Sequence, residues 1–311
     1  MKFGIIGFGK IARKFVKSIT YTDEGKVIAI GSHSLDENDH YLINHPNVRL
    51  YRDYNEMLAD ENIDAVYIAV PHQYHLEWII KSLQAKKAVL CEKPAVLDEK
   101  CYETIKQVAK ENNTYFLEAF KTVFNPGFSQ LKKDLALIGS PITIEDNFCY
   151  KYEGSKSDTY LFDKDEGGAL YDIGTYTFGF IQKLVNSSIV DIDTDFNYQD
   201  GIDLSFEAHL EFEDGTKSIS KGSIIENEDR VATITGPNGR IIIPYYNRIT
   251  DYVIELSDDN IKRKFNIKGD DMTLEIQCLI NDVKKHKLES NIFSIEDSRK
   301  LIETINRVKN N

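Results

Sequence analysis

A glycine-rich turn near the N-terminus constrains the fold of this chain more than any other feature. It reads Gly7-Phe8-Gly9-Lys10-Ile11-Ala12, a G-x-G-x-x-A pattern that follows the apolar run Lys2–Ile6 and opens a helical pattern. In such a turn the first glycine allows a tight reversal, the second lets a pyrophosphate approach the backbone, and the small alanine lets helix and strand pack closely. The N–H groups at the helix start then face the phosphates. We interpret this segment as a dinucleotide-binding turn; the alternative is a turn that only serves packing.

The first 120 residues alternate short apolar runs with amphipathic segments. In the first amphipathic segment, Ile11, Phe15 and Ile19 recur at four-residue spacing. Strands buried on both faces read as continuous apolar runs, and helical connections between them imply parallel pairing. We therefore predict an α/β domain over residues 1–120, a doubly wound parallel sheet of the Rossmann type. Its predicted strands are residues 2–6, 26–30, 48–51, 65–69, 88–91 and 115–118.

After residue 120 the chain has many strand-like segments and few helices between them. Turn signals such as Glu213-Asp214-Gly215 and Pro237-Asn238-Gly239 separate these segments, as the hairpins of an antiparallel sheet require. We predict a second, α+β domain over residues 121–311 with a large, mostly antiparallel sheet that binds substrate and mediates oligomerisation. The predicted strands are residues 189–198, 204–212, 217–225, 231–235, 240–243, 252–256 and 262–265.

Four helices are predicted in this second part. Asn125-Pro126 and Gly139 supply the start and stop signals of the first helix, and residues 169–185 form the second. Residues 272–285 and 295–308 complete the set, and a Ser294-x-x-Asp297 capping pattern opens the last helix. This final helix is able to pack back on the first domain.

Composition excludes several classes of protein. The chain carries 38 basic and 50 acidic residues, a net charge of −12, and such a surface repels nucleic acid. No apolar run approaches the length of about 20 residues that a membrane span needs, and no signal peptide is visible at the N-terminus. The four cysteines show no metal-site spacing and are expected to be reduced, which favours the cytoplasm.

The tip of the second predicted strand bears on the choice of cofactor. An acid that binds the adenosine ribose is expected about 20 residues after the glycine turn. The chain instead reads Ile30-Gly31-Ser32-His33-Ser34, without a carboxylate. We expect Ser32 and His33 to contact the cofactor there, with Lys10 and Arg13 as further candidates. The absence of an acid favours NADP, and NAD is the other cofactor considered.

Two loops follow the fourth and fifth predicted strands, at the carboxyl edge where open α/β sheets bind ligands. Cys91-Glu92-Lys93-Pro94 places a lysine where it can contact substrate or nicotinamide, although a solvated surface lysine is the alternative. Pro71-His72-Gln73-Tyr74-His75 contains a His-x-x-His pair, but no further cysteine or carboxylate group completes a metal site by spacing. We therefore expect no metal, and we expect Pro71, His75, Glu92 and Lys93 to lie beside the cofactor.

A third motif, residues 167–176, reads Gly-Gly-Ala-Leu-Tyr-Asp-Ile-Gly-Thr-Tyr. On a helix, Asp172 and Tyr176 are four residues apart and share one face. A carboxylate and a phenol that point into one cleft suit hydrogen bonding to a polyol and proton transfer. The alternative is an acid near a helix start and a tyrosine that only packs.

Together the three motifs resemble the glucose–fructose oxidoreductase / inositol dehydrogenase (Gfo/Idh/MocA) family of NAD(P)-dependent oxidoreductases, in the same order and spacing. The resemblance implies that Lys93 is catalytic and that Asp172 contacts substrate. Tyr176, where many members have histidine, is more similar to the branch of dihydrodiol dehydrogenase and glucose–fructose oxidoreductase. Lys121 and Val123 depart from that branch, which usually has a tryptophan and an arginine there.

These features lead to one functional hypothesis and two alternatives. We predict an NAD(P)-dependent dehydrogenase or reductase that transfers hydride between nicotinamide and a carbinol carbon of a sugar, cyclitol or dihydrodiol-like substrate. Tyr176 would exchange the hydroxyl proton, Lys93 would stabilise the alkoxide and lower the pKa of the phenol, and Asp172 would orient a hydroxyl. The alternatives are a nucleotide- or sugar-sensing regulatory protein and a hydrolase or lyase that recycles bound NAD.

Apolar residues in the late strands lead to a prediction about assembly. An antiparallel sheet needs its second face covered or made polar. No predicted helix covers both sides of the strands that carry Ile219, Ile225, Ile241 and Ile243. We therefore expect a homodimer, or a dimer of dimers, through the second domain, as is common in the family that the chain resembles.

Overall fold

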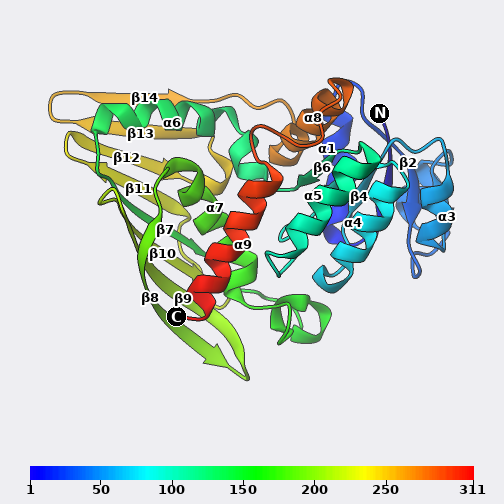
Figure 1. Cartoon of the computed structure of the whole chain (residues 1–311), viewed down its shortest axis with the longest axis horizontal. Coiled ribbons are helices and arrows are strands. Elements are labelled where there is room, and N and C mark those ends of the chain that lie inside the picture. The colour runs from blue at the N-terminus through cyan, green and yellow to red at the C-terminus, as the bar shows by residue number, and fades with distance from the viewer. The chain divides into compact units, whose positions relative to one another are not determined.

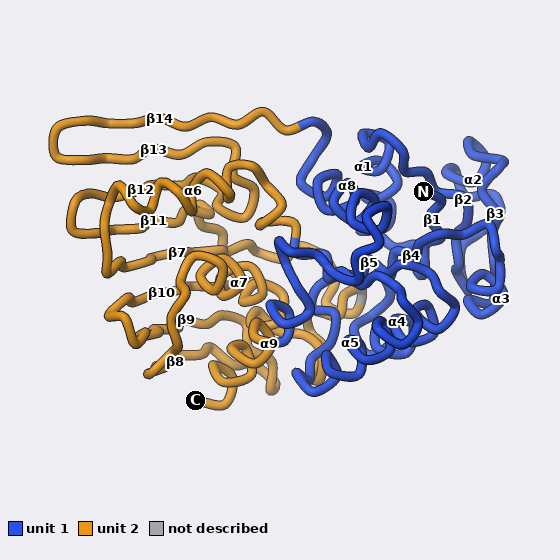
Figure 2. Tube along the Cα trace, turned by 45° about the horizontal axis from the view of Figure 1, so that its top comes forward, with its two compact units in different colours: residues 1–120, 268–299 blue, residues 121–267, 300–311 orange. Residues whose placement is uncertain are grey.

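The structure, a computed structural model, describes residues 1–311 apart from the side chain of Asp158. The chain divides into two compact units (Figure 2). Unit 1 contains Met1–Phe120 and Lys268–Arg299, and unit 2 contains Lys121–Ile267 and Lys300–Asn311. The division at residues 1–120 and 121–311 that the sequence suggested differs from these units in one stretch, residues 268–299, which packs with unit 1.

Unit 1 is built on a six-stranded sheet in the order β3-β2-β1-β4-β5-β6. Figure 1 labels β2, β4 and β6 of this sheet. Every neighbouring pair in it is parallel. Burial on both faces explains the continuous apolar runs, since every residue of β4 and of β5 is buried. The predicted doubly wound sheet is therefore confirmed. The strands are β1 (Lys2–Ile6), β2 (Lys26–Gly31), β3 (Arg49–Tyr51), β4 (Ala65–Ile68), β5 (Ala88–Cys91) and β6 (Phe116–Glu118).

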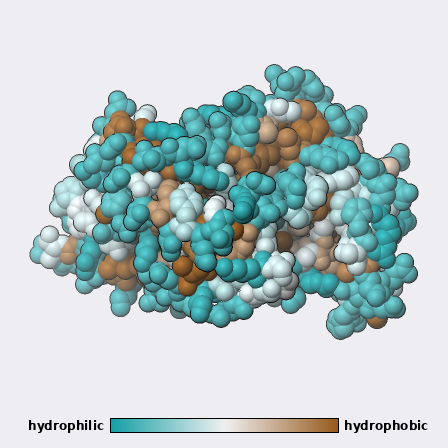
Figure 3. All heavy atoms as spheres, turned by 90° about the horizontal axis from the view of Figure 1, so that it is seen from below, coloured by the Kyte–Doolittle hydropathy of each residue, from teal (hydrophilic) through white to brown (hydrophobic). Residues whose placement is uncertain are grey.

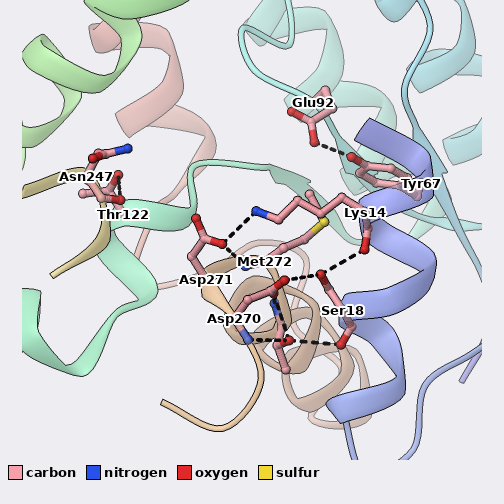
Figure 4. Close-up of polar contacts among 10 residues, drawn as sticks. Lys14, Ser18, Tyr67, Glu92, Thr122, Asn247, Asp270, Asp271 and Met272 are labelled. Atoms are coloured by element: carbon pink, nitrogen blue, oxygen red, sulfur yellow. Dashed lines mark hydrogen bonds and ion pairs between the residues drawn. The ribbon is translucent and has the colours of Figure 1, made fainter. Parts of the chain in front are cut away.

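The helices of unit 1 include one from the far end of the chain. They are α1 (Lys10–Ser18), α2 (His40–Asn44), α3 (Tyr54–Ala59), α4 (His75–Gln84), α5 (Cys101–Asn112) and α8 (Asp271–Lys284), with short turns η1 (Ile19–Tyr21) and η2 (His72–Tyr74). Helix α8 packs on α1 through polar contacts (Figure 4). Lys14 Nζ lies 3.0 Å from Asp271 Oδ1, and Ser18 Oγ donates to Asp270 Oδ2 at 2.7 Å. These contacts explain why residues 268–299 belong to unit 1.

Unit 2 is built on an eight-stranded sheet in the order β14-β13-β12-β11-β7-β10-β9-β8. All neighbours are antiparallel except β7 and β10, so the predicted large, mostly antiparallel sheet is confirmed. Sequence reasoning missed β7, which lies in the middle of the sheet. The strands are β7 (Thr143–Cys149), β8 (Ile189–Gln199), β9 (Ile202–Phe212), β10 (Lys217–Ser223), β11 (Val231–Gly236), β12 (Gly239–Pro244), β13 (Asp251–Leu256) and β14 (Asn260–Lys264).

Helices cover one face of this sheet, because α6 packs on β12 and α7 packs on β7 and β10. The predicted caps of α6 are present: the Asn125 side chain accepts from the Gly127 N–H, and the helix ends at Gly139. The predicted Ser294–Asp297 cap of α9 also forms, with Asp297 N donating to Ser294 Oγ at 3.1 Å. The helical segments outside unit 1 are η3 (Lys121–Phe124), α6 (Pro126–Ile138), η4 (Lys156–Asp158), η5 (Tyr160–Phe162), the π-helix η6 (Leu170–Gly174), α7 (Thr175–Leu184), η7 (Tyr246–Arg248) and α9 (Ile295–Lys309), which begins in unit 1.

The sequence left four isoleucines of the late strands without a helix to cover them, and the structure shows that two of these are covered. Ile241 and Ile243 are fully buried, on the face of β12 that α6 covers, so they leave no apolar surface open. Ile219 and Ile225 are half-buried. The register of the strands aligns Ile219, Thr233, Ile242 and Val253 in one row across the open face, with Glu145 between the first two.

Polar side chains dominate the visible surface. Charged residues make up 28% of the chain, and hydrophilic side chains cover most of the face shown in Figure 3. No helix in the described part of the chain is long and apolar enough to cross a membrane.

Asp146 is a buried acid in the unit 2 sheet, and its burial predicts how stability depends on pH. This carboxyl on β7 accepts hydrogen bonds from Ser220 Oγ at 2.9 Å and from the Tyr246 hydroxyl at 3.0 Å. Burial raises its pKa from 3.8 to about 7. Between these values the folded state keeps a proton that the unfolded chain releases, so stability should fall as pH rises, by up to about 1.4 kcal/mol per pH unit.

Asp146→Asn keeps the size of the side chain and removes its titration. We expect the variant to gain stability over the wild type as pH rises from about 4 to about 7, measured by urea unfolding across that range. The exposed-site variant Asp251→Asn is the control and should follow the wild type. A constant difference between Asp146→Asn and wild type at all pH values would contradict the assigned shift.

Candidate active site

The glycine turn after β1 has the geometry of an anion cradle. Gly7 has φ +87°, and a Cβ there would lie 2.8 Å from the Ala69 carbonyl oxygen, so only glycine fits. At Gly9 an added Cβ would meet nothing within 4 Å, which leaves the backbone open to a ligand. Helix α1 then begins without a side-chain cap or an acidic residue in its first turn, while Ala12 is fully buried. The first N–H groups of α1 are thus available to a pyrophosphate, and the predicted turn fits a dinucleotide.

Side chains at the carboxyl end of β2 form hydrogen bonds with nearby backbone groups. Ser32 Oγ accepts from the Leu35 N–H at 3.1 Å, and His33 Nδ1 lies 2.8 Å from the Arg52 carbonyl oxygen. The Arg52 guanidinium donates to the Leu35 carbonyl at 2.6 Å, which puts a cation beneath this loop that sequence reasoning missed. Arg52 comes directly after β3. It was not predicted as a cofactor-binding residue because it lies far along the chain from the glycine turn.

Arg13 is less available to a 2′-phosphate than the sequence suggested. Its guanidinium lies 2.6 Å from Asp39 Oδ2 in an ion pair, and it also covers the ring of Phe8 at 4.7 Å. The hydrogen bond from Arg13 is the main reason why the pKa of Asp39 is lowered. Lys10, by contrast, is exposed at the start of α1.

The loop after β4 is tied to the loop after β5 by a buried histidine. His75 Nε2 lies 2.8 Å from the Val70 carbonyl oxygen, and Nδ1 lies 3.2 Å from the Pro94 carbonyl oxygen. Burial lowers the pKa of His75, which favours the neutral ring. His75 therefore positions the two loops, while Pro71 is exposed beside it. No group of three or more potential metal ligands occurs among the residues that the structure describes.

Two sets of hydrogen bonds surround the Glu92-Lys93-Pro94 loop, one at Glu92 and one at Glu118. Tyr67 donates its hydroxyl to Glu92 (Figure 4), and the ring of Phe15 stacks on Tyr67. Lys93 is only 8% exposed. Behind it Glu118 accepts from the Ala95 N–H at 3.0 Å and from the Tyr102 hydroxyl at 2.8 Å. Burial raises the pKa of Glu118, and the charge of Lys93 opposes that rise, so the lysine lies near a buried carboxyl group.

In unit 2 the two glycines of the third motif permit an unusual helix start. A Cβ at Gly168, which has φ +96°, would lie 2.0 Å from Asp203 Oδ1. Asp203 Oδ2 accepts from the Leu170 N–H at 2.6 Å, so this carboxylate caps the first turn. The turn is the π-helix η6, which runs directly into α7. The predicted helical stretch over residues 169–185 is present, but Asp172 lies in the π-helix η6 and Tyr176 in α7, so the four-residue spacing of an α-helix does not set their directions.

Asp172 and Tyr176 lie in a group of aromatic and charged residues. The Tyr150 and Tyr160 hydroxyls donate to the two oxygens of Asp172, at 2.8 and 2.9 Å. Burial and the Asp172 charge raise the pKa of both phenols, and Tyr176 contributes to the rise. Sequence reasoning missed both tyrosines, because Tyr150 follows the unrecognised strand β7 and Tyr160 begins the short helical turn η5, which was not predicted either.

Tyr176 itself lies between an aromatic ring and a cation. Its ring centre is 5.3 Å from that of Phe148, and Lys121 Nζ lies 5.4 Å from the centre of the Tyr176 ring. Thus the structure places Gly7–Ala12, Pro71, His75, Glu92 and Lys93 at the carboxyl edge of the unit 1 sheet, and it places Asp172 and Tyr176 in unit 2.

Two family models match the chain. Residues 1–120 match the oxidoreductase family with an NAD-binding Rossmann fold, and residues 134–242 match the GFO/IDH/MocA C-terminal domain. The chain therefore belongs to the Gfo/Idh/MocA family of oxidoreductases, as its motifs predicted. It is an enzyme of the NAD(P)-dependent class, which acts by hydride transfer.

Similar proteins of known activity cover nearly the whole chain. The scyllo-inositol 2-dehydrogenase (NADP(+)) IolU of Bacillus subtilis is 29% identical over 309 residues, which cover 96% of this chain and 93% of the relative. A trans-1,2-dihydrobenzene-1,2-diol dehydrogenase of Xenopus tropicalis is 27% identical over 317 residues, with the same two coverages of 96% and 93%.

Solved structures confirm the fold. The 3-ketoreductase KijD10 from Actinomadura kijaniata, in complex with NADP and TDP-benzene, has a TM-score of 0.89 at 21% identity and covers 100% of this chain and 97% of its own. The aldose–aldose oxidoreductase from Caulobacter crescentus has a TM-score of 0.88 at 16% identity, with coverages of 100% and 96%.

The open backbone at Gly9 provides a test of cofactor binding. A valine there would fill the space that a pyrophosphate needs, so Gly9→Val should abolish NADP binding, measured by calorimetry. Gly201→Asn is the control, because it adds a side chain at another glycine with open space around it and suits the φ of +82° there. Wild-type affinity in a folded Gly9→Val variant would contradict the assignment.

Proposed function

We propose that this enzyme transfers hydride between a nicotinamide dinucleotide and the carbinol carbon of a sugar, cyclitol or dihydrodiol-like substrate. Unit 1 would hold the dinucleotide and unit 2 the substrate. The observation that carries the proposal is the phenol of Tyr176, which lies beside the ammonium of Lys121 and in the same group as the carboxylate of Asp172. Such a group suits proton exchange with a hydroxyl.

Three side chains have proposed roles. A tyrosine with the ordinary pKa of about 10 is a poor base at neutral pH, so proton exchange by Tyr176 needs a nearby positive charge. Lys93 would supply that charge and a hydrogen bond to the developing alkoxide. Asp172 would orient a substrate hydroxyl, since a carboxylate that accepts two phenol hydrogen bonds still has lone pairs for a further donor. The bound nicotinamide supplies or accepts the hydride.

The cofactor proposed is NADP, with NAD as the alternative. Ser32 and His33 stand at the β2 tip where an acid would repel a 2′-phosphate, and Arg52 adds a cation beneath the same loop. The name of the relative IolU specifies NADP(+), which supports this choice.

Turnover distinguishes the proposed function from its two alternatives. A regulatory protein would bind nucleotide or sugar without changing nicotinamide absorbance. A hydrolase or lyase that recycles NAD would form product with no net change in reduced nicotinamide. A screen of inositols, aldoses and dihydrodiols with both cofactors would identify a dehydrogenase by the steady appearance or loss of NAD(P)H.

Tyr176→Phe removes the transferable proton with little change of shape. We expect turnover to fall by roughly 10²–10⁴-fold while cofactor affinity survives, because Tyr176 belongs to unit 2. Lys93→Met should lose at least as much activity, since the charge and a hydrogen bond are both removed. The exposed-site variant Tyr245→Phe is the matched control and should keep wild-type turnover. Full activity of Tyr176→Phe on a good substrate would move the acid/base role to Lys93 or to a water held by Asp172.

We further propose that the enzyme is a homodimer, or a dimer of dimers, through the open face of the unit 2 sheet. The support is the row of Ile219, Thr233, Ile242 and Val253 across that face. Ion pairs flank the row, including Arg240 with Glu255 at 2.6 Å. An apolar centre with a charged rim is typical of protein interfaces.

Light scattering at micromolar concentration tests this assembly. The wild type should have a mass near two or four times the 35.6 kDa of one chain. Ile242→Asp should shift the mass toward the monomer, because it buries a charge at the centre of the interface. Leu137→Asp, at an exposed apolar residue of α6, is the control. A monomeric wild type would rule the interface out.

A further inference from the structure

A second cation of unit 2 lies next to the group around Tyr176. The guanidinium carbon of Arg230, just before β11, lies 4.0 Å from the centre of the Phe148 ring. Phe148 is in turn the ring 5.3 Å from Tyr176. Arg230 therefore lies one aromatic ring away from the phenol to which the acid/base role is assigned.

The side chain of Arg230 is half-buried. Among the residues whose side chains the structure describes, no acidic group forms an ion pair with it. Burial is the main reason why the pKa of Arg230 is lowered, and the nearby charge of Arg248 lowers it further. The groups that oppose this are the phenols of Tyr176, Tyr150 and Tyr246. A partly desolvated guanidinium that forms no ion pair is unfavourable until an anion binds it.

Among the side chains that the structure describes, neither Asp172 nor Asp146 forms an ion pair with Arg230. Both oxygens of Asp172 accept phenol hydrogen bonds, from Tyr150 and Tyr160. Asp146, deeper in the sheet, is bound by Ser220 and Tyr246, and burial raises its pKa to about 7, so part of it is neutral at physiological pH. Unit 2 therefore has hydrogen-bonded carboxyl groups near Tyr176, and it has a guanidinium, Arg230, that forms no ion pair with a described side chain.

We propose that Arg230 binds an oxyanion of the substrate, so that the enzyme acts on an acidic polyol rather than on a neutral one. The oxyanion is a carboxylate or a phosphate, as in a sugar acid or a sugar phosphate. The planar guanidinium suits both, because it donates two parallel hydrogen bonds to two oxygens of one group. This inference rests on the proposed function, since it concerns the substrate of the same site.

The arrangement also explains how an acidic protein could attract an acidic substrate. The net charge of −12 repels anions at long range. The half-buried guanidinium of Arg230, stacked on Phe148, makes the potential positive at short range. Because Arg230 and Tyr176 both lie against the Phe148 ring, a single substrate would place its anionic group at Arg230 and a hydroxyl at Tyr176.

Equilibrium binding tests the anion site independently of catalysis. The protein saturated with NADP is titrated by calorimetry with D-glucuronate, D-glucose 6-phosphate and D-glucose. We expect at least one of the two acids to bind about ten- to a hundredfold more tightly than glucose. Glucuronate and glucose 6-phosphate differ in the anion, so their order shows whether the site prefers carboxylate or phosphate. Failure of both acids to bind more tightly than glucose overturns the proposal.

Variants of Arg230 test whether this residue causes the tighter binding of acids than of glucose. Arg230→Met keeps a side chain that packs on Phe148 and should abolish the preference for the acid over glucose. Arg230→Lys keeps the charge and should retain part of the preference. Arg240→Met removes an arginine paired with Glu255 on the open face of the sheet, and it should behave as the wild type. Equal preference for the acid in Arg230→Met and wild type overturns the assignment.

Turnover measured in parallel separates this inference from the function on which it rests. Oxidation of glucose without any preference for acids supports the dehydrogenase and overturns the anion site. A preference for acids that depends on Arg230, without turnover of any polyol, supports the anion site and counts against the proposed reaction.

Discussion

The dinucleotide-binding loops of unit 1 depend on the central position of β1 in a parallel sheet. β1 pairs with β2 on one side and with β4 on the other, so the chain leaves it in one direction and later returns on the opposite side. A ligand site forms where the connections separate in this way. The turn at Gly7, the tip at Ser32, the loop at Pro71 and the loop at Lys93 are far apart in sequence, but all follow the carboxyl ends of strands in this sheet.

Unit 2 depends on a different constraint, the close contact between a glycine pair and a buried acid. Asp203 of β9 occupies the space where a side chain at Gly168 would lie, and it caps the start of η6. This contact fixes the helix start against the sheet. The π-helical turn that follows sets the direction of Asp172 relative to Tyr176, and the tyrosines at positions 150 and 160 then hold the carboxylate. A functional role for a π-helical turn is common in proteins.

The distribution of charge inside unit 2 is the opposite of that on the whole chain. The sequence has a net charge of −12, whereas the groups that line Tyr176 include Lys121 and, one ring further, Arg230. Stacking on aromatic rings stabilises these cations where water is scarce. The fold is shared with an aldose–aldose oxidoreductase and a 3-ketoreductase, so the fold alone does not select the substrate, and the proposal assigns that selection to the charges of these side chains.

The amino-acid sequence by itself determined the class of both folds, the three motifs and the family. Glycine turns, capping residues and the run of apolar strands are local signals, and they predicted the strands of unit 1 and the caps of α6 and α9. Strand β7 escaped because Thr143–Cys149 alternates apolar with charged residues only briefly, and its partners come from distant hairpins. Sequence also left Ile241 and Ile243 apparently uncovered, because the packing of α6 on β12 is a long-range contact.

Only the tertiary structure decided which side chains surround Tyr176. It also decided the ion pairs: Arg13 is paired with Asp39, whereas Arg230 has no acidic partner among the described side chains. Local pattern gives the backbone path, but charge balance depends on which distant segments the fold brings within a few ångströms.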